Sequence, residues 1–161
     1  MSEKKEKPQT DTTRRGFVKT AGTAAAATSV AAIGFPNVTF GAPNDRKLKI
    51  GVVGTGGRGG GAMLNALAAD DNVELWAAGD LYLAEAEKKL AMVRKSPIAK
   101  DKLAEGLDGR VFSGIDSYKQ VIDSGVDVIL LTTPPAFRPT HFKAAVEAGI
   151  HAFVEKPCAT D

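Results

Sequence analysis

Cysteine and histidine are scarce in this sequence, which has one cysteine and two histidines among 161 residues. A single cysteine, Cys158, excludes a disulfide within the chain, and we expect its side chain to pack as a small hydrophobic group. No spaced set of Cys, His and Asp residues suggests a metal site, so we expect no bound metal. His141 falls in a predicted helix and His151 at a predicted strand start, and both are expected to pack rather than to act as ligands or bases.

The chain also lacks a basic surface pattern beyond its N-terminus. It has 21 Lys and Arg residues against 19 Asp and Glu, but six of the basic and three of the acidic residues lie within the first 42 positions. The remaining 15 basic and 16 acidic residues form no basic stripe, so nucleic acid is not an expected partner. The length and the 43% hydrophobic content suit one globular domain.

Residues 1–42 have the composition of an export signal. A polar lead with Arg14 and Arg15 precedes an Ala-rich apolar stretch that runs from about Ala21 to Phe35. The sequence TRRGFVK resembles a twin-arginine signal, which implies the twin-arginine export machinery as a partner and the periplasm as the location. A membrane anchor is the alternative, but this stretch is short and weakly apolar for a stable span. We expect the segment before Asn44 to be mobile and separate from the domain at 43–161.

A glycine-rich turn opens that domain, directly after a predicted buried strand at Leu48–Val53. Gly54 permits a tight turn, Gly56 lets the backbone approach a pyrophosphate, and Gly59 lets the following helix pack closely on the strand. The phosphates would then lie at the N-terminus of that helix. Taken alone, such a turn is weak evidence for a nucleotide site. The turn has the pattern GxGxxG and consists of Gly54, Thr55, Gly56, Gly57, Arg58 and Gly59.

A carboxylate at the end of the second predicted strand supports the nucleotide interpretation. Asp80 lies 21 residues beyond Gly59, close to the spacing expected for the acid that binds the adenosine ribose. A carboxylate at this place accepts hydrogen bonds from the 2′-hydroxyl and repels a 2′-phosphate, so the sequence favours NAD over NADP, although NADP is not excluded. Asp80 could also be the N-cap of the helix predicted at 83–95.

The rest of the chain alternates predicted strands and helices. Strand patterns lie near 111–112, 126–135 and 151–157, and helix patterns near 117–122 and 142–149. This alternation predicts an α/β fold with a doubly wound parallel sheet. Because the carboxyl ends of parallel strands share one edge, we expect Gly54, Asp80, Thr133 and Lys156 to project into a single crevice there.

From about Lys47 onward the chain resembles the Gfo/Idh/MocA family of nicotinamide-dependent oxidoreductases. The resemblance rests on GVVGTGGRG, on TTPPAFRPTHFKAAVEAGIHAFVEKP, and above all on the closing pattern AGxHxxxEKP. It implies a Rossmann domain with Thr132, Thr133 and Pro134 in the cofactor site, the last two on the nicotinamide side. It also implies that Glu155 contacts the cofactor's ribose or nicotinamide region. Lys156 would be the catalytic residue, which binds the substrate hydroxyl and helps to move its proton.

The resemblance further implies hydride transfer between NAD(P) and a sugar, cyclitol or related polyol, by a protein that is a homo-oligomer at full length. An NAD-dependent glycoside hydrolase and a non-catalytic nucleotide-binding fragment are the alternatives. Many members have histidines where this chain has Ala136, Phe137 and Arg138. We expect this chain to lack the family's C-terminal α/β domain, to bind cofactor without turning over substrate, and to leave an uncovered apolar edge near Val154.

Overall fold

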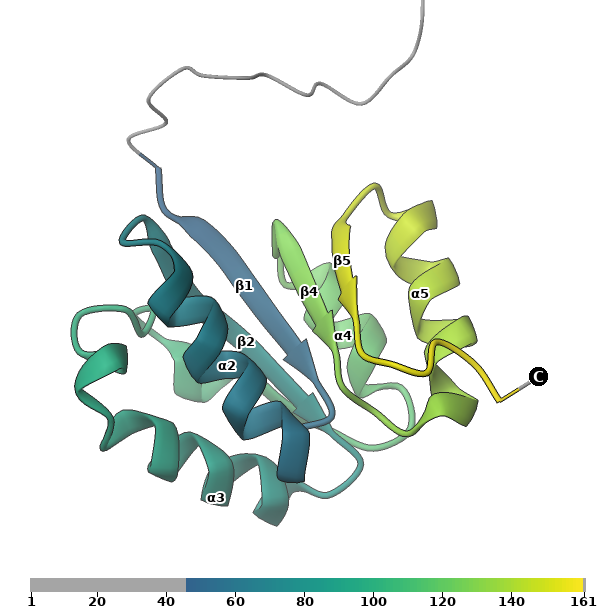
Figure 1. Cartoon of the computed structure of the whole chain (residues 1–161), viewed down its shortest axis with the longest axis horizontal. Helices are drawn as coiled ribbons and strands as arrows, with labels where there is room; N and C mark the ends of the chain where they lie inside the picture. Colours follow the sequence, from purple (N-terminus) through teal and green to yellow (C-terminus); the bar gives the residue numbers. More distant parts are fainter. Residues whose placement is uncertain (1–45, 161) are drawn as a thin grey trace, which may run out of the picture. The chain divides into compact units, whose positions relative to one another are not determined.

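Five parallel strands form one sheet in the computed structural model, which describes residues 46–160 (Figure 1). The strand order is β3-β2-β1-β4-β5, with every neighbouring pair parallel. This is the order of a Rossmann sheet, and it confirms the doubly wound α/β fold predicted from the sequence. The predicted export signal and the segment before Asn44, which was expected to be mobile, lie outside the described residues. The strands are β1 (Leu48–Val53), β2 (Val73–Asp80), β3 (Val111–Ser113), β4 (Val128–Leu131) and β5 (His151–Val154).

Helices cover both faces of the sheet (Figure 1). On one face, α2 (Gly57–Ala69) and α3 (Leu83–Arg94) enclose a core that includes Val52, Met63 and Leu67. On the other face, α4 (Ser117–Asp123) and α5 (Arg138–Glu147) enclose a second core. Adjacent residues of β1 therefore point into different cores, as expected for a strand buried on both faces. Short 3-10 turns complete the connections at Pro97–Ala99, Leu107–Arg110 and Pro135–Phe137.

β5 is an edge strand of the described sheet, and one of its faces is only partly covered. Phe153 is 49% exposed and borders a shallow surface pocket together with Ala62 and Leu130. The apolar edge expected near Val154 is thus present. The expectation that Cys158 packs is wrong, because it lies in an exposed segment after β5 that no described element covers.

Among the helices between residues 46 and 160, none has both the length and the apolar character needed to cross a bilayer.

Candidate functional site

The glycine-rich turn joins β1 to α2 and is tightly packed on the side facing the sheet. Gly54 has a φ of +88°, and a Cβ added there would lie 2.6 Å from the backbone nitrogen of Thr133. A Cβ on Gly59 would lie 2.1 Å from the carbonyl oxygen of Gly54. At Gly56 and Gly57, by contrast, an added Cβ would meet nothing within 4 Å. The turn therefore excludes side chains toward the sheet and presents open backbone at the N-terminus of α2.

Asp80, at the end of β2, holds this turn through Thr55. Its Oδ2 accepts hydrogen bonds from the backbone nitrogen of Thr55 at 2.6 Å and from the Thr55 hydroxyl at 2.9 Å. Its Oδ1 accepts a hydrogen bond from the backbone nitrogen of Tyr82 at 3.2 Å. The N-cap residue of α3 is Tyr82, so the suggestion that Asp80 caps this helix is wrong. The carboxylate instead faces the glycine-rich turn.

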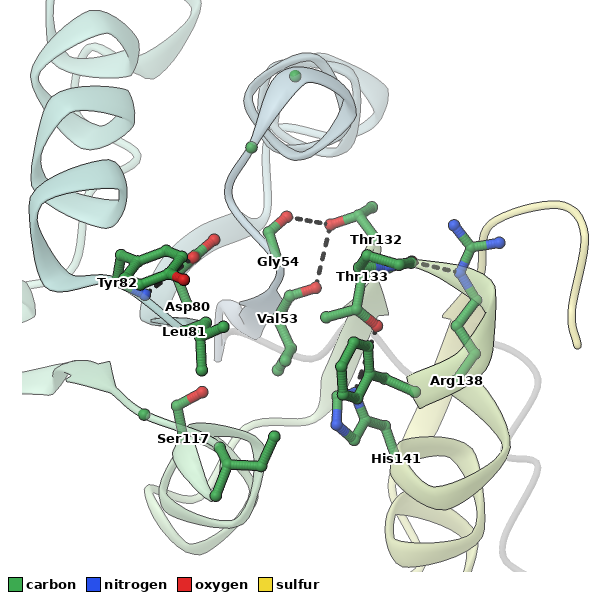
Figure 2. A pocket seen from close by; sticks show the side chains of 16 residues that line it. Val53, Gly54, Asp80, Leu81, Tyr82, Ser117, Thr132, Thr133, Arg138 and His141 are labelled. Atoms are coloured by element: carbon green, nitrogen blue, oxygen red, sulfur yellow. Dashed lines mark hydrogen bonds between the residues drawn. The ribbon is translucent and has the colours of Figure 1, made fainter. Parts of the chain in front are cut away.

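Two threonines at the end of β4 form the opposite wall (Figure 2). The Thr132 hydroxyl lies 2.5 Å from the carbonyl oxygen of Gly54 and 3.1 Å from that of Val53, which ties β4 to the turn. The Thr133 hydroxyl lies 3.3 Å from Nδ1 of His141. His141 is buried and stacks on Tyr118 with ring centroids 4.3 Å apart, in line with the expected packing role, whereas His151 is exposed and the same expectation is wrong for it. Burial lowers the pKa of His141 and so favours its neutral form.

These walls enclose a cavity of about 430 Å³ at the carboxyl ends of β1, β2 and β4. Seven of the residues predicted for the cofactor site line it, namely Gly54, Gly56, Gly57, Asp80, Thr132, Thr133 and Pro134. Sequence reasoning missed the lining residues that follow β2 and β3 or lie at the start of α4 and α5. These are Leu81, Tyr82, Gly114, Ile115, Ser117, Phe137, Arg138 and His141. The loop after β3 was predictable in principle, because the strand-end rule applies to that strand as well.

The remaining predicted residues do not line this cavity. Thr55 and Gly59 are buried behind the turn. Arg58 and Glu155 form an ion pair in which Nε lies 2.5 Å from Oε1, and Glu155 is only 8% exposed. Lys156 is exposed, so the prediction that it shares one crevice with Gly54, Asp80 and Thr133 is wrong. The reason is its position after β5, an edge strand of the described sheet, where its side chain is exposed.

The side chains and open backbone of the cavity fit a dinucleotide. The open positions at Gly56 and Gly57 lie at the N-terminus of α2, whose first turn contains no acidic residue to repel phosphate. A carboxylate acceptor, Asp80, lies on the neighbouring wall, and Leu81 and Ile115 provide apolar surface beside it. No group of three or more His, Cys, Asp or Glu side chains is placed to bind a metal ion anywhere from residue 46 to residue 160.

The fold and the cavity together define an NAD-binding Rossmann domain. Residues 48–161 match the Gfo/Idh/MocA profile, described as an oxidoreductase family with an NAD-binding Rossmann fold. The chain belongs to this family.

Named relatives include dehydrogenases and one hydrolase. A glycosyl hydrolase family 109 protein of Streptomyces coelicolor is 32% identical over 116 residues, which cover 71% of this chain and 23% of that protein. The WlbA dehydrogenase of Chromobacterium violaceum, solved with NADH and UDP-GlcNAcA, is 25% identical with a TM-score of 0.57 and coverages of 78% and 32%. Scyllo-inositol dehydrogenase of Lactobacillus casei, solved with NAD(H) and scyllo-inositol, is 24% identical, with a TM-score of 0.56 and coverages of 72% and 30%, and shows the fold alone. The chain thus spans roughly a quarter to a third of each of these proteins.

Proposed function

We propose that this protein is a nicotinamide-dependent oxidoreductase that transfers hydride between NAD and a hydroxyl-bearing carbon of a sugar, cyclitol or related polyol. The observation that carries the proposal is the cavity at the strand ends, where open glycine backbone and the Asp80 carboxylate face the same space. Family membership supports the redox chemistry, and the polyol and sugar-nucleotide ligands in the titles of two structural relatives support the substrate class.

In this proposal the phosphates bind at the start of α2. Gly56 and Gly57 leave their backbone accessible, and the free N–H groups of a helix N-terminus attract anions. Gly59 has no contact with the cavity, and its role is to let α2 lie against the carbonyl of Gly54. The phosphate-binding turn therefore depends on the absence of side chains at two kinds of position, the buried Gly59 and the open Gly56 and Gly57.

The adenosine ribose binds at Asp80 in this arrangement. Oδ2 already accepts two hydrogen bonds from Thr55, so Oδ1, which has one bond at 3.2 Å, has the larger free capacity to accept from a ribose hydroxyl. A negative charge here disfavours a 2′-phosphate, which is the basis for preferring NAD over NADP.

The nicotinamide end lies toward Thr133 and Pro134, on the side of the cavity nearest β5. When bound, NAD supplies the hydride acceptor or donor. Lys156 would contact the substrate hydroxyl, orient the reacting carbon, and hold or accept the hydroxyl proton at Nζ. The exposure of Lys156 leaves it accessible to a substrate approaching from outside the domain.

Absorbance of reduced nicotinamide provides the test. The full-length protein, which includes the family's C-terminal α/β domain, is incubated with NAD and a panel of inositols, aldoses and sugar nucleotides, and compared with its Lys156→Ala variant. We expect reduction of NAD that depends on the polyol and is lost in the variant, while calorimetry shows NAD binding in both. Turnover that persists in Lys156→Ala would contradict the assigned role.

Glycoside hydrolysis with catalytic use of NAD is a second candidate, favoured by the 32% identity to the Streptomyces protein named as a glycosyl hydrolase. This reaction differs from that of a dehydrogenase because it causes no net oxidation or reduction: the sugar is oxidised and then reduced again within one turnover. Cleavage of an aryl glycoside that requires NAD, with no net formation of NADH, would select this candidate over the dehydrogenase.

Export by the twin-arginine route is also part of the proposal, and it rests on the motif around Arg14 and Arg15. Fractionation of cells that express the protein tests it. We expect the wild type in the periplasm and an Arg14→Lys, Arg15→Lys double variant in the cytoplasm. Equal periplasmic amounts of both would contradict this route.

A further inference from the structure

Arg138 connects the ends of two neighbouring strands through backbone carbonyls. Its Nε donates to the carbonyl oxygen of Thr133 at 2.7 Å, and its Nη1 donates to that of Glu155 at 2.7 Å and also to that of Pro157. Thr133 follows β4, whereas Glu155 and Pro157 follow β5 and flank Lys156 on either side. The backbone on both sides of the proposed catalytic lysine is therefore bonded to a single guanidinium.

The side chain of Arg138 is unusually buried for a charged group. Arg138 is only 6% exposed, and no carboxylate in the described part of the chain lies within ion-pair distance of it. Its charge is instead stabilised by carbonyl dipoles. The planar guanidinium uses two of its nitrogens, Nε and Nη1, to reach these carbonyls, whereas all three donors of a lysine lie on the single Nζ atom. In Figure 2 its guanidinium lies beyond Thr133 and away from Asp80.

Arg58 also contacts the segment around Lys156, through the side chain of Glu155. It lies in the first turn of α2, next to the open glycine positions, and its Nε pairs with Oε1 of Glu155. The second carboxylate oxygen of Glu155 accepts a hydrogen bond from the backbone nitrogen of Lys156 at 3.3 Å. The carboxylate thus links the phosphate-binding turn to the amide of the lysine.

We propose that Arg138 and Arg58 are positioning residues that fix the backbone of Lys156 relative to the nicotinamide end of the cavity. Arg138 holds the carbonyls on both sides of the lysine, and Arg58 holds the carboxylate that accepts from its amide. This inference rests on the proposed function, because it assigns both arginines to the placement of a lysine whose catalytic role is itself proposed.

Arg110 offers a matched control for a purely structural arginine. Its Nε donates to the carbonyl oxygen of Trp76 at 2.8 Å and its Nη2 to that of Glu105 at 2.7 Å. It therefore makes the same kind of carbonyl contacts as Arg138, but it precedes β3 and does not line the cavity. Arg110→Lys should destabilise the protein in a comparable way without affecting the turn around Lys156.

Amide hydrogen exchange of the intact protein, followed residue by residue by NMR, tests the proposal without any turnover. The readouts are the amide of Glu155, which donates to the carbonyl oxygen of Leu131, and the amide of Lys156. In Arg138→Lys we expect both to exchange about tenfold faster or more, while the amide of Thr55 keeps its wild-type rate. In Arg58→Gln we expect faster exchange at Lys156 alone. Unchanged rates at Lys156 in both variants, or an equal acceleration in Arg110→Lys, would overturn the proposal.

Kinetics extend the test to the proposed reaction. If the protein turns over a polyol, Arg138→Lys should lower kcat about tenfold or more and leave the KM for NAD within about twofold, since the lysine is misplaced but the phosphate cradle is intact. A rise in the KM for NAD with an unchanged kcat would contradict the positioning role. Absence of turnover in the full-length wild type would count against the proposed function, while the exchange result would still decide the role of the arginines.

Discussion

Thr55 and Asp80 are joined by two hydrogen bonds that end on the same carboxylate oxygen, at 2.6 Å from the Thr55 nitrogen and 2.9 Å from its hydroxyl. Thr55 lies within the glycine-rich turn and is completely buried, and Asp80 ends the neighbouring strand. The acid that is expected to recognise the ribose thus also fixes the turn that is expected to bind the phosphates. The cavity is preorganised by this link before any ligand binds.

A double-mutant cycle measures the link directly. Thr55→Val removes the hydroxyl with little change in volume, and Asp80→Ala removes its acceptor. Because a hydrogen bond of this kind contributes about 1 kcal/mol or somewhat more, the two changes in the free energy of unfolding should be coupled by about that amount in urea titrations. Simple additivity of the two single variants would show that the contact contributes nothing.

Asp80 should also determine the choice between NAD and NADP. Replacing it with Ala or Ser removes a ribose acceptor and the charge that repels a 2′-phosphate, so we expect the preference for NAD in calorimetric Kd values to shrink by about tenfold. Asp71→Ala is the control, because Asp71 is an exposed acid that pairs with Lys102 away from the cavity. A wild-type protein that binds NADP more tightly than NAD would contradict the role given to Asp80.

Two nearby glycines of α2 should respond to alanine in opposite directions. A Cβ on Gly59 would overlap the carbonyl oxygen of Gly54 at 2.1 Å, so we expect Gly59→Ala to destabilise the protein by about 1–3 kcal/mol and to weaken NAD binding. A Cβ on Gly61 would meet only the Arg58 guanidinium at 3.4 Å, so Gly61→Ala should stabilise the helix by about 0.5–1 kcal/mol. Chemical denaturation of both variants checks this, and equal effects would rule out the close packing described for Gly59.

The buried histidine predicts a pH dependence of stability. Burial lowers the pKa of His141 from its usual 6.5, so the unfolded chain binds a proton more readily than the folded one. The contribution of neutral His141 to the free energy of unfolding is therefore complete above pH 6.5. It decreases as the pH drops from 6.5 toward the lowered pKa of the folded state, by at most about 1.4 kcal/mol per pH unit. Urea titrations across this range should show the slope in the wild type and in His151→Gln, but not in His141→Gln. The lowered pKa values of Asp71 and Asp127 act only in more acidic solution.

Sequence reasoning correctly placed the residues that directly follow the strongly hydrophobic strands. Hydrophobic runs and the rule that parallel strands end at one edge were sufficient to bring Gly54, Asp80 and Thr133 together. The start of α5 was predicted too late, near His141 and Phe142, whereas the helix begins at Arg138. The apolar pattern begins at Phe142, but Pro139 is compatible with the first helical turn, where its missing N–H is not needed.

The contacts of Arg138 could not be predicted from the sequence. Its partners are backbone carbonyls, two of them 17 and 19 residues away, and a carbonyl carries no side-chain signature. The same applies to the ion pair of Arg58 and Glu155, since each residue had been assigned separately to the cofactor. Lys156 was placed in the crevice by the strand-end rule, which does not specify how the chain turns after an edge strand.

Titration of NAD into isotope-labelled protein, followed by NMR, tests the central claim most directly. The account predicts saturable binding at one site, with shifts concentrated at Gly54–Gly57, Asp80–Tyr82 and Thr132–Pro134 around the cavity. Trp76, which lies in the middle of β2 and does not line the cavity, should not respond. Absence of binding, or shifts centred on Trp76 instead of the glycine-rich turn, would contradict the assignment of this cavity to NAD.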